Sequence, residues 1–321
     1  MDVIAHYQTF LVVVLALLLD KIFAEPKRFH PLVGFGNLAI YIEKRLNRFT
    51  YIFASRFCGV IAWLILVLPL PVLCMWGMAQ LPLYGQIIIS AVGLYAAIGL
   101  ASLKQHGLQV YQPLTEQDLT TARHFTGYLV SRETAELTPD EMARATTESM
   151  LENGHDAVIA SLVCFVIGGL PLVIAHRLAN TLDAMWGYKN QRFIHFGWAA
   201  ARLDDLLGFV SGKVCTLLYA IQGLFKGRFL SALSNAMTQG NQYKSHNGGW
   251  VMAAGATVLN IKLGGSAIYH GQIKHSVELG QGEAIDATSI KTSIELVERA
   301  AFCLCGFLWL ALVTQFSFSF F

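Results

Sequence analysis

Three charged side chains between residues 138 and 154 repeat at intervals of four. Arg144, Glu148 and Glu152 would therefore lie on one face of a helix. A solvated row of ion pairs is one interpretation of this face. A binding site is the other, because the row points toward Asp156 at the start of an apolar run, where acidic groups need a bound cation or a nearby base.

A second polar segment, residues 177–205, lies between two apolar runs. Its acids and bases are Asp183, Asp204, Asp205, Arg177, Lys189, Arg192 and Arg202. A loop at the membrane interface would explain its Trp, Tyr, Lys and Arg side chains, but not the two adjacent aspartates. Carboxylates bind Mg²⁺ together with phosphate oxygens, and arginine binds phosphate through two hydrogen bonds. The segment therefore favours a metal and a phosphate-bearing substrate at a membrane surface.

Familiar nucleotide and metal motifs are absent from the sequence. Residues 208–214 lack one spacer residue of a P-loop and have Val214 where Ser or Thr would bind Mg²⁺. Residues 34–39 imitate a dinucleotide fingerprint, but no acidic residue follows at the required distance. The six cysteines all lie in apolar runs without metal or redox spacing, as expected of small buried side chains.

The composition is that of a membrane protein. Of the 321 residues, 55% are hydrophobic and only 14% are charged, and the mean hydropathy is +0.50. The net charge of +2 is small and scattered, which argues against a nucleic-acid partner.

Several uncharged runs are long enough to cross the roughly 30 Å hydrocarbon layer as helices. The first is an uncharged stretch, 57–103, that Pro82 divides into two. The others are 3–19, 157–175, 206–225 (interrupted by Lys213) and 300–321. Pro69, Pro71 and the Gly168-Gly169-x-Pro171 group should break or kink their helices. We expect about five spans.

We predict an all-α, polytopic α-helical membrane protein with cytoplasmic helical insertions and no sheet. It would form a single integral-membrane domain, residues 1–321, with polar insertions at about 25–56, 104–156, 177–205 and 226–299. One inserted helix is well marked: Thr138-Pro139-Asp140-Glu141 predicts its start as a capping box, and Asn153-Gly154 predicts its end.

The distribution of basic residues predicts the orientation. Those between the first apolar run and the uncharged stretch are Lys27, Arg28, Lys44, Arg45, Arg48 and Arg56. This bias places residues 25–56 in the cytoplasm, and parity places 104–155 there as well. The broken run 157–175 either crosses the membrane or re-enters on the same side, and the sequence leaves both possibilities open.

Six segments give the chain a resemblance to the adenosylcobinamide-phosphate synthase family, membrane enzymes of cobalamin biosynthesis. They follow one another in the family's order along most of the chain and are EPKRFHPLVGFGNL (25–38), SRETAELTPDEMARATTESMLENGHDAVIA (131–160), TLDAMWGYKN (181–190), FGWAAARLDD (196–205), NGGWVMAA (247–254) and KLGGSAIYHG (262–271). The most specific feature is the pattern E-S-x-x-E-N-x-x-D followed by N-T-L-D-x-M-x-G-Y-x-N.

The resemblance implies an ATP-dependent amide ligase. It would join aminopropanol or its phosphate to the free propionate of adenosylcobyric acid, giving adenosylcobinamide or its phosphate. A carboxylate is a poor electrophile, so such ligases commonly phosphorylate it and let the amine displace the phosphate. The chemistry needs ATP, Mg²⁺, cationic groups for the phosphates and a base for the ammonium.

Site residues follow by combining the resemblance with the polar segments. The expected catalytic carboxylates are Glu148, Glu152, Asp156 and Asp183. The expected metal ligands are Glu148, Asp183, Asp204 and Asp205. The expected substrate or nucleotide contacts are Arg132, Asn153, Asn180, Tyr188, Lys189, Asn190, Arg192, Arg202, Asn247, Trp250, Gly264 and Gly265. Trp250 is placed in a Gly-rich loop, and Gly264 and Gly265 at a tight turn or a close backbone approach. We expect these groups to converge in one pocket beside the bilayer.

Two other classes of protein also fit some of these features. A small-solute transporter would place acids and Gly/Pro breaks at membrane depth, but it predicts an internal repeat that the sequence lacks. A noncatalytic membrane sensor or assembly subunit could use the same polar segments for protein contacts. The expected setting is the bacterial inner membrane with the polar site in the cytoplasm. The expected partners are the corrinoid, the amine, lipid and other membrane enzymes of the cobalamin pathway.

Overall fold

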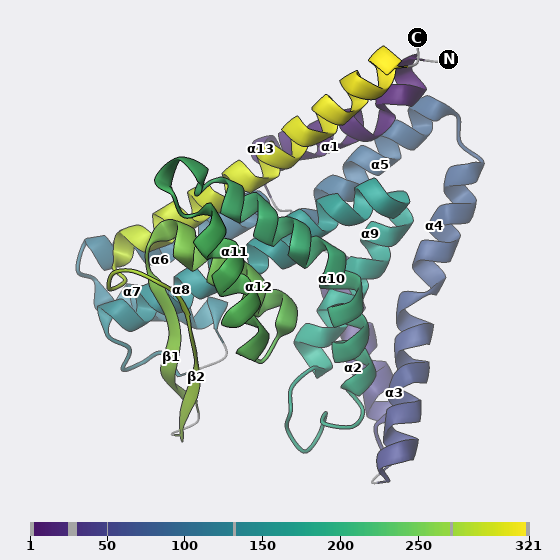
Figure 1. Ribbon diagram of the computed structural model, residues 1–321. Coiled ribbons are helices and arrows are strands. Elements are labelled where there is room, and N and C mark those ends of the chain that lie inside the picture. The colour runs from purple at the N-terminus through teal and green to yellow at the C-terminus, as the bar shows by residue number, and fades with distance from the viewer. Residues whose placement is uncertain (1–2, 25–30, 50, 131–132, 270–271, 319–321) are drawn as a thin grey trace. The chain divides into compact units, whose positions relative to one another are not determined.

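The computed structural model describes residues 3–24, 31–49, 51–130, 133–269 and 272–318. Helices dominate these residues, and two strands interrupt them (Figure 1). The predicted α-helical membrane fold is therefore confirmed. The expectation of no sheet is wrong, because two strands between residues 262 and 280 form a hairpin.

Four helical stretches of the described residues are long and apolar enough to cross a membrane. They are Ile52–Ala79, Leu83–Thr115, Pro139–Trp186 and Ala287–Thr314. The predicted runs within 57–103 and at 157–175 fall inside these stretches, and the run at 300–321 largely does. The run at 206–225 lies mostly in α10 (Trp198–Ile221), which is not among the four.

Proline and glycine interrupt the helices where the sequence predicts. Helix α3 (Ile52–Val67) ends just before Pro69, at which α4 (Pro69–Ala79) begins. Gly168 and Gly169 leave helical geometry inside α9 (Ala160–Trp186). Gly169 has a φ of +63°, a conformation that glycine adopts at the least steric cost.

The chain folds into two compact units, which are described separately. Unit 1 comprises Met1–Ile98 and Ala160–Phe209, and unit 2 comprises Gly99–Ile159 and Val210–Phe321. The single domain expected from the sequence remains a prediction. The site residues expected from the sequence are distributed over both units.

Unit 1 is built around α9. Its other helices are α1 (Val3–Phe23), α2 (Pro31–Leu46), α3, α4 and α5 (Leu83–Ala97). Helices α2, α3, α4 and α5 pack against α9, and α1 packs along α5. The apolar core includes Trp186 at the end of α9 and Phe196, whose rings meet edge to face with 5.1 Å between centroids. These two aromatic residues pin the loop 187–197 between α9 and α10.

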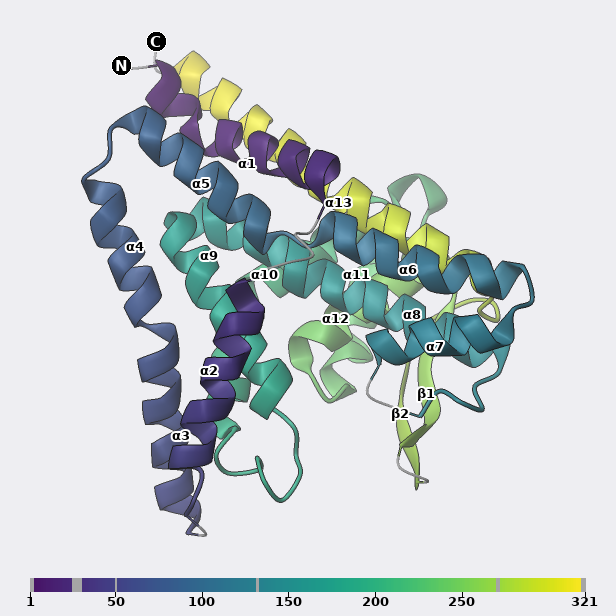
Figure 2. The same ribbon diagram turned by 180° about the vertical axis from the view of Figure 1, so that it is seen from behind.

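Unit 2 consists mainly of helices that pack on α8 and α12. Its elements include α6 (Leu100–Thr115), α7 (Leu119–Leu129), α8 (Pro139–Asn153), α11 (Phe229–Thr238), α12 (His246–Leu259) and α13 (Ala287–Phe318). Helices α6, α7 and α8 lie side by side (Figure 2). Helix α13 packs against α6 and α8, and α12 packs against α8 and α11.

Helix α8 starts and ends at the predicted residues, but the chain after it remains helical. Thr138 and Glu141 form the capping box, with Pro139 in the first turn. The α-helix ends at Asn153 as predicted, but the chain stays helical, because a π-helical turn, η1 (Gly154–Ile159), leads from α8 into α9. A Cβ atom at Gly154 would lie 2.7 Å from the Tyr219 hydroxyl. Gly154 therefore permits close helix packing and does not act as a terminator.

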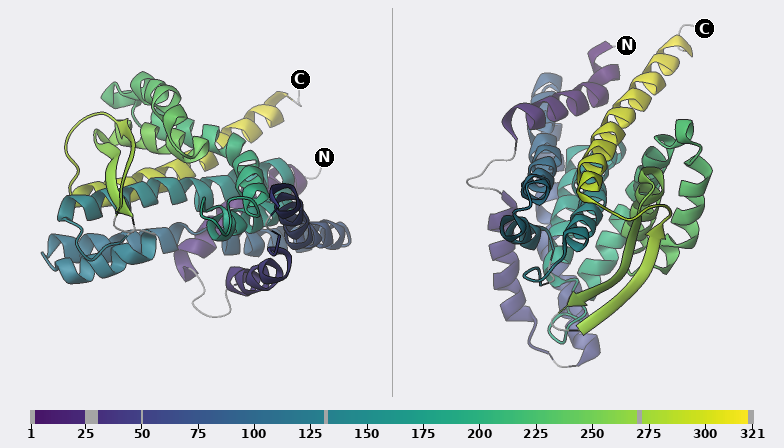
Figure 3. Two further views of the ribbon diagram at one scale, coloured as in Figure 1. Left: turned by 90° about the horizontal axis from the view of Figure 1, so that it is seen from below. Right: turned by 90° about the vertical axis from the view of Figure 1, so that its left-hand side faces the viewer.

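The hairpin packs against α11 and α12 (Figure 3). Strands β1 (Lys262–Tyr269) and β2 (Gln272–Gly280) are antiparallel, and their register shifts between Leu263 and Gly265. Leu263 and Leu279 pair across the strands and are both buried. At the shift, Gly264 (φ +76°) approaches the Val277 carbonyl too closely for any side chain, which confirms the expected close backbone approach.

Candidate functional site

The structure divides the predicted site residues between the two units. Unit 1 holds Asn180, Asp183, Tyr188, Lys189, Asn190, Arg192, Arg202, Asp204 and Asp205. Unit 2 holds Glu148, Glu152, Asn153, Asp156, Asn247, Trp250, Gly264 and Gly265. Arg132 lies outside the described residues. The expected convergence of all these groups in one pocket remains a prediction.

In unit 2, the charged face of α8 is anchored to the hairpin. Glu148 Oε1 accepts a hydrogen bond of 2.7 Å from the backbone N–H of Gly264. Arg144 donates one of 3.3 Å to the Gly264 carbonyl. Hydrogen bonds to charged groups are stronger than those between neutral groups, so the two side chains fix both sides of one glycine. The solvated row of ion pairs is therefore not what these two residues form.

Glu152, one turn further along α8, lies beside the first turn of α12. Ser245 caps that helix by accepting a hydrogen bond of 3.3 Å from the Gly248 N–H. A Cβ atom at Gly248 would lie 2.8 Å from Glu152 Oε1, so a side chain there would displace this carboxylate from its present position. A helix N-terminus carries partial positive charge and favours a nearby anion. The placement of Trp250 in a loop is wrong, because 246–250 begin α12.

The π-helical turn supplies a second acidic position. His155 is buried, and its Nδ1 lies 2.7 Å from Asp156 Oδ1, while its Nε2 lies 3.0 Å from Ser211 Oγ of α10. Asp156 and Glu148 add negative charge near Glu152, and Lys244 adds positive charge. π-Helical turns occur frequently at functional sites. The charges of Glu148 and Asp156 therefore both act on Glu152 within unit 2.

Lys213 of α10 is a functional candidate that the sequence interpretation did not select. Its Nζ lies 2.9 Å from the centre of the Trp250 ring and 3.0 Å from His246 Nε2. Burial lowers the pKa of Lys213 to about 8. The sequence did carry a signal, because Lys213 is the only charge between residues 206 and 225.

The donor set of unit 2 is compatible with Mg²⁺ only in partnership with a phosphate. In the part of the chain that the structure describes, no three His, Cys, Asp or Glu side chains cluster closely enough to hold a metal ion. Magnesium usually takes one or two carboxylates and completes its shell with water and substrate phosphates. Glu148, Glu152 and Asp156 offer such carboxylates, and Lys213 offers a cation.

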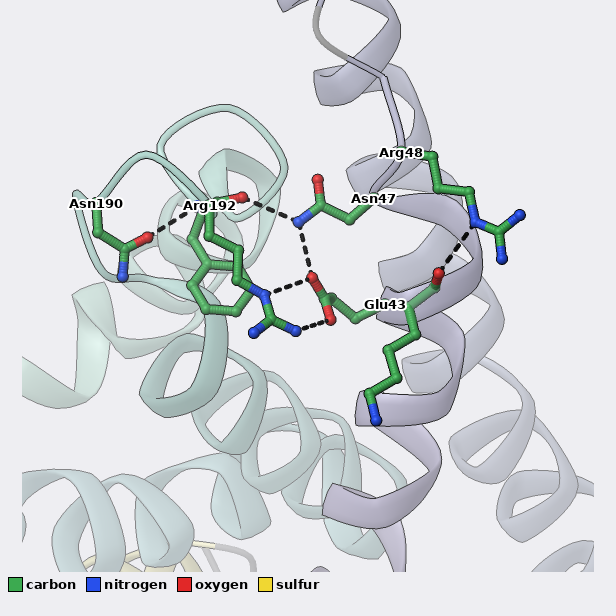
Figure 4. A network of polar contacts seen from close by, with 7 residues as sticks. Glu43, Asn47, Arg48, Asn190 and Arg192 are labelled. Atoms are coloured by element: carbon green, nitrogen blue, oxygen red, sulfur yellow. Dashed lines mark hydrogen bonds and ion pairs between the residues drawn. The ribbon is translucent and has the colours of Figure 1, made fainter.

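In unit 1, an ion pair between the buried carboxylate of Glu43 and the exposed guanidinium of Arg192 connects the predicted loop to α2. Arg192 donates from Nε to Glu43 Oε1 over 3.0 Å and from Nη2 to Oε2 over 2.6 Å (Figure 4). The Glu43 side chain is 4% exposed, whereas that of Arg192 is 58% exposed. This guanidinium already binds the Glu43 carboxylate. A substrate group that binds Arg192, as predicted, would compete with Glu43 for the same donors.

An amide completes this arrangement. Asn47 donates over 2.8 Å to Glu43 Oε1 and over 2.9 Å to the Arg192 carbonyl (Figure 4). Burial alone would raise the pKa of Glu43, but the bonds from Arg192 and Asn47 and the Arg192 charge bring that pKa below its usual value. In the same loop, Asn190 Oδ1 accepts from the Phe193 N–H at 3.0 Å. The loop is therefore held by defined contacts.

The remaining unit 1 candidates flank this loop. Asn180 and Asp183 lie on the last two turns of α9, and a Cβ atom at Gly187 would collide with the Asp183 carboxylate. Tyr188 and Lys189 are exposed on the loop itself. The first two turns of α10 carry Arg202, Asp204 and Asp205. Acids and bases thus come from both ends of one pinned loop.

Comparison with known proteins assigns the chain to a family. The family model described as "CobD/Cbib protein" matches residues 13–297. The chain belongs to this family. A relative from Stutzerimonas stutzeri, named "Cobalamin biosynthesis protein CobD", is 48% identical over 288 residues, which cover 90% of this chain and 93% of the relative.

Two further relatives have the same name, "Cobalamin biosynthesis protein CobD". The protein from Chromobacterium violaceum is 44% identical over 306 residues, covering 93% of each chain. The protein from Halalkalibacterium halodurans is 33% identical over 304 residues, covering 93% of this chain and 95% of the relative. No solved structure matches the chain. The resemblance inferred from the sequence segments is therefore confirmed at the level of the family.

Proposed function

We propose that this chain acts in cobalamin biosynthesis as an ATP-dependent amide ligase. It would join aminopropanol or its phosphate to the free propionate of adenosylcobyric acid. The observation that carries the proposal is membership of the CobD/Cbib family over residues 13–297, with relatives named for cobalamin biosynthesis. The acid- and base-rich contacts in both units support an enzyme over a purely structural subunit.

In the proposed reaction the terminal phosphoryl group of ATP would pass to an oxygen of the propionate and ADP would leave, and the amine nitrogen would then attack the acyl carbon and displace phosphate. Carboxylates of unit 2, Glu148, Glu152 and Asp156, would hold Mg²⁺ when the nucleotide is bound, and one of them would accept the proton that the ammonium loses. Magnesium would neutralise charge on the phosphates. Lys213 would contribute a cation to the same phosphates.

The unit 1 groups would serve substrate binding and positioning. Asp183, Asp204 and Asp205 are further proposed carboxylates, and Lys189 and Arg202 are proposed phosphate contacts. The amides Asn153, Asn180 and Asn247 have the donors and acceptors that recognise the amide side chains of a corrinoid or a nucleotide. The proposed setting is the bacterial inner membrane with the polar groups in the cytoplasm, beside other membrane enzymes of the pathway.

A direct assay tests this proposal. The purified protein in detergent is supplied with ATP, Mg²⁺, adenosylcobyric acid and either aminopropanol or its phosphate, and amide formation is followed by mass spectrometry. We expect Glu148→Gln and Asp183→Asn to lower turnover at least about a hundredfold, the usual scale for losing an acid–base group. Gln at position 148 can still accept the hydrogen bond from Gly264, so this change removes charge more than structure.

Lys291→Ala is the matched control, because Lys291 is an exposed residue of α13 outside the proposed site. It should leave turnover within about twofold of the wild type. Near-normal turnover in both site variants, with the fold intact, would show that the site is misplaced. Absence of any ATP-dependent amide formation by the wild type would favour a noncatalytic sensor or assembly subunit.

A further inference from the structure

Unit 2 contains a cavity at the base of the hairpin. Its volume is about 360 Å³, within the range of small-molecule sites. The first turns of α8, the start of β1, the end of β2 and the segment 282–285 line it. All of these elements belong to one compact unit.

Charged side chains of both signs enter this lining from three directions. Asp140 and Arg144 share a face of α8 because they are four residues apart. Lys262 and Glu278 lie on the strands at positions that alternate with the buried Leu263 and Leu279, and so take the opposite face of the hairpin. Glu283 follows from the segment after β2.

These five side chains do not neutralise one another. In the described structure no ion pair joins any two of Asp140, Arg144, Lys262, Glu278 and Glu283. Arg144 uses Nη1 on the Gly264 carbonyl, which leaves other guanidinium donors for a ligand. Two cations and three carboxylates around one small cavity suit a guest that carries both charges.

Glycines keep the cavity open on the hairpin side. Gly264 and Gly265 line it with bare backbone, and a Cβ atom at Gly265 would lie 3.7 Å from Arg144 Nη1. Any longer side chain at position 265 would extend into the space beside that guanidinium. The φ of +80° at Gly265 also disfavours other residues.

We infer that this cavity binds a small molecule that carries an ammonium group and an anionic group. Arg144 and Lys262 would hold the anionic group, and the carboxylates of Asp140, Glu278 and Glu283 would hold the ammonium. A simple anion would use only the two cationic side chains, and a simple amine only the three carboxylates, so a guest with both charges makes the most contacts.

The position of the cavity connects it to the acidic row of α8. Arg144 precedes Glu148 by about one helical turn, and Glu148 precedes Glu152 by another. A guest at Arg144 would therefore lie at one end of the row whose carboxylates we propose for catalysis. Identifying the guest as the phosphorylated amine substrate rests on the proposed function, whereas the charge pattern of the cavity does not.

Binding measured without ATP or corrinoid tests the assignment. Isothermal titration of the detergent-purified full chain uses three probes: aminopropanol phosphate, aminopropanol and inorganic phosphate. We expect the wild type to bind the first at least about tenfold more tightly than either of the others, the scale of one lost charged hydrogen bond. Lys262→Glu should weaken aminopropanol phosphate and inorganic phosphate by about tenfold or more, and Glu283→Gln should weaken aminopropanol phosphate and aminopropanol.

Lys291→Glu is the control, because it makes the same charge change on the exposed surface of the same unit outside the cavity. It should bind all three probes as the wild type does. The inference is overturned if Lys262→Glu keeps wild-type affinity for aminopropanol phosphate, or if Lys291→Glu loses as much affinity.

The two proposals fail separately. Tight binding of aminopropanol phosphate by a wild type that forms no amide would refute the ligase and support the cavity. Amide formation by Lys262→Glu with an unchanged KM for the amine would refute the cavity and leave the ligase in place.

Discussion

Lys213 is an unusual residue for its position. It is the only charge in an apolar stretch, and it lies against an indole ring and an imidazole. A desolvated ammonium loses its proton more readily than one in water, which is why burial lowers its pKa to about 8. Near neutral pH this side chain is still mostly a cation, as phosphate binding requires, but it discharges at mildly alkaline pH.

Chemical labelling should reveal this lowered pKa directly. Acetic anhydride reacts with the neutral amine, so the labelling rate of Lys213, followed by mass spectrometry, should rise with a midpoint near pH 8 in the folded protein. In the unfolded chain the same lysine should titrate near its ordinary value of 10.5. A folded-state midpoint as high as that of the unfolded chain would contradict the burial of Lys213.

Single residues show what local sequence signals can and cannot predict. The capping box at Thr138 and Glu141 was predictable, because it depends only on residues three apart. Gly154 carries the same glycine signal that ends many helices, but here tertiary packing against Tyr219 is the reason for the glycine. Local chemistry alone does not distinguish a terminator from a packing glycine.

At the scale of elements, the hairpin depends on Gly264. Alanine there combines a positive φ with a collision between its Cβ and the Val277 carbonyl. Gly227 is a matched control, because its φ is +65° but no atom lies within 4 Å of an added Cβ. We expect Gly227→Ala to cost about 1 kcal/mol and Gly264→Ala about 1 to 3 kcal/mol more, measured by thermal unfolding in detergent. Equal losses would show that the hairpin tolerates a side chain at this position.

The tie between α2 and the loop 187–197 should depend on pH. The folded-state pKa of Glu43 is below its usual 4.5, so its ion pair contributes stability above that pH and loses it as pH falls through the folded-state pKa. Glu43→Gln should cost about 1 to 3 kcal/mol at pH 7. The difference from the wild type should shrink below about pH 4.5.

Glu295→Gln serves as a comparison, because the pair of Glu295 with Arg299 is exposed on both sides. Such surface pairs contribute about 0 to 1 kcal/mol. If the Glu43 variant lost no more stability than the Glu295 variant, the pair of Glu43 with Arg192 would not hold the loop. Thermal unfolding of both variants between pH 3.5 and 7 provides the measurement.

The Glu43–Arg192 pair could not have been predicted from one sequence. The two residues are 149 positions apart, and no sequence pattern around either one indicates its partner. The hairpin was missed for a different reason: its paired glycines at 264 and 265 weaken the usual strand pattern. Contacts between distant parts of the chain leave no local pattern, so they could not be predicted. Helices with a local hydrophobic or capping pattern could be predicted.

For the whole molecule, hydropathy was the reliable guide. An uncharged run that is long enough to cross the membrane as a helix strongly limits the possible folds. The runs within 57–103 and at 157–175 lie inside candidate spans. The site was predicted less completely, since its residues were chosen by type and by family resemblance. Lys213 and Glu43 are recognised as candidates only from their contacts in the folded chain.

The proposed chemistry makes one prediction at the scale of the whole membrane protein. Basic residues are concentrated between the first apolar run, 3–19, and the uncharged stretch, 57–103. This concentration predicts that the polar segments face the cytoplasm. Tyr188→Cys in unit 1 and Gln242→Cys in unit 2 place reporters on exposed residues, without the collision that a side chain at Gly187 would cause. Each is introduced into a chain whose six native cysteines are replaced by serine or alanine.

In intact cells, a membrane-impermeant maleimide should label neither reporter, and in inverted membrane vesicles it should label both. A reporter placed in the same background on the uncharged turn at Gln80 gives the control, because parity places that turn on the opposite side and predicts the reverse pattern. An ATP-dependent enzyme needs its nucleotide-binding groups on the side where ATP is abundant. Labelling of either polar reporter from outside intact cells would therefore show that its segment does not face the cytoplasm, and would contradict a role for that unit in the proposed active site.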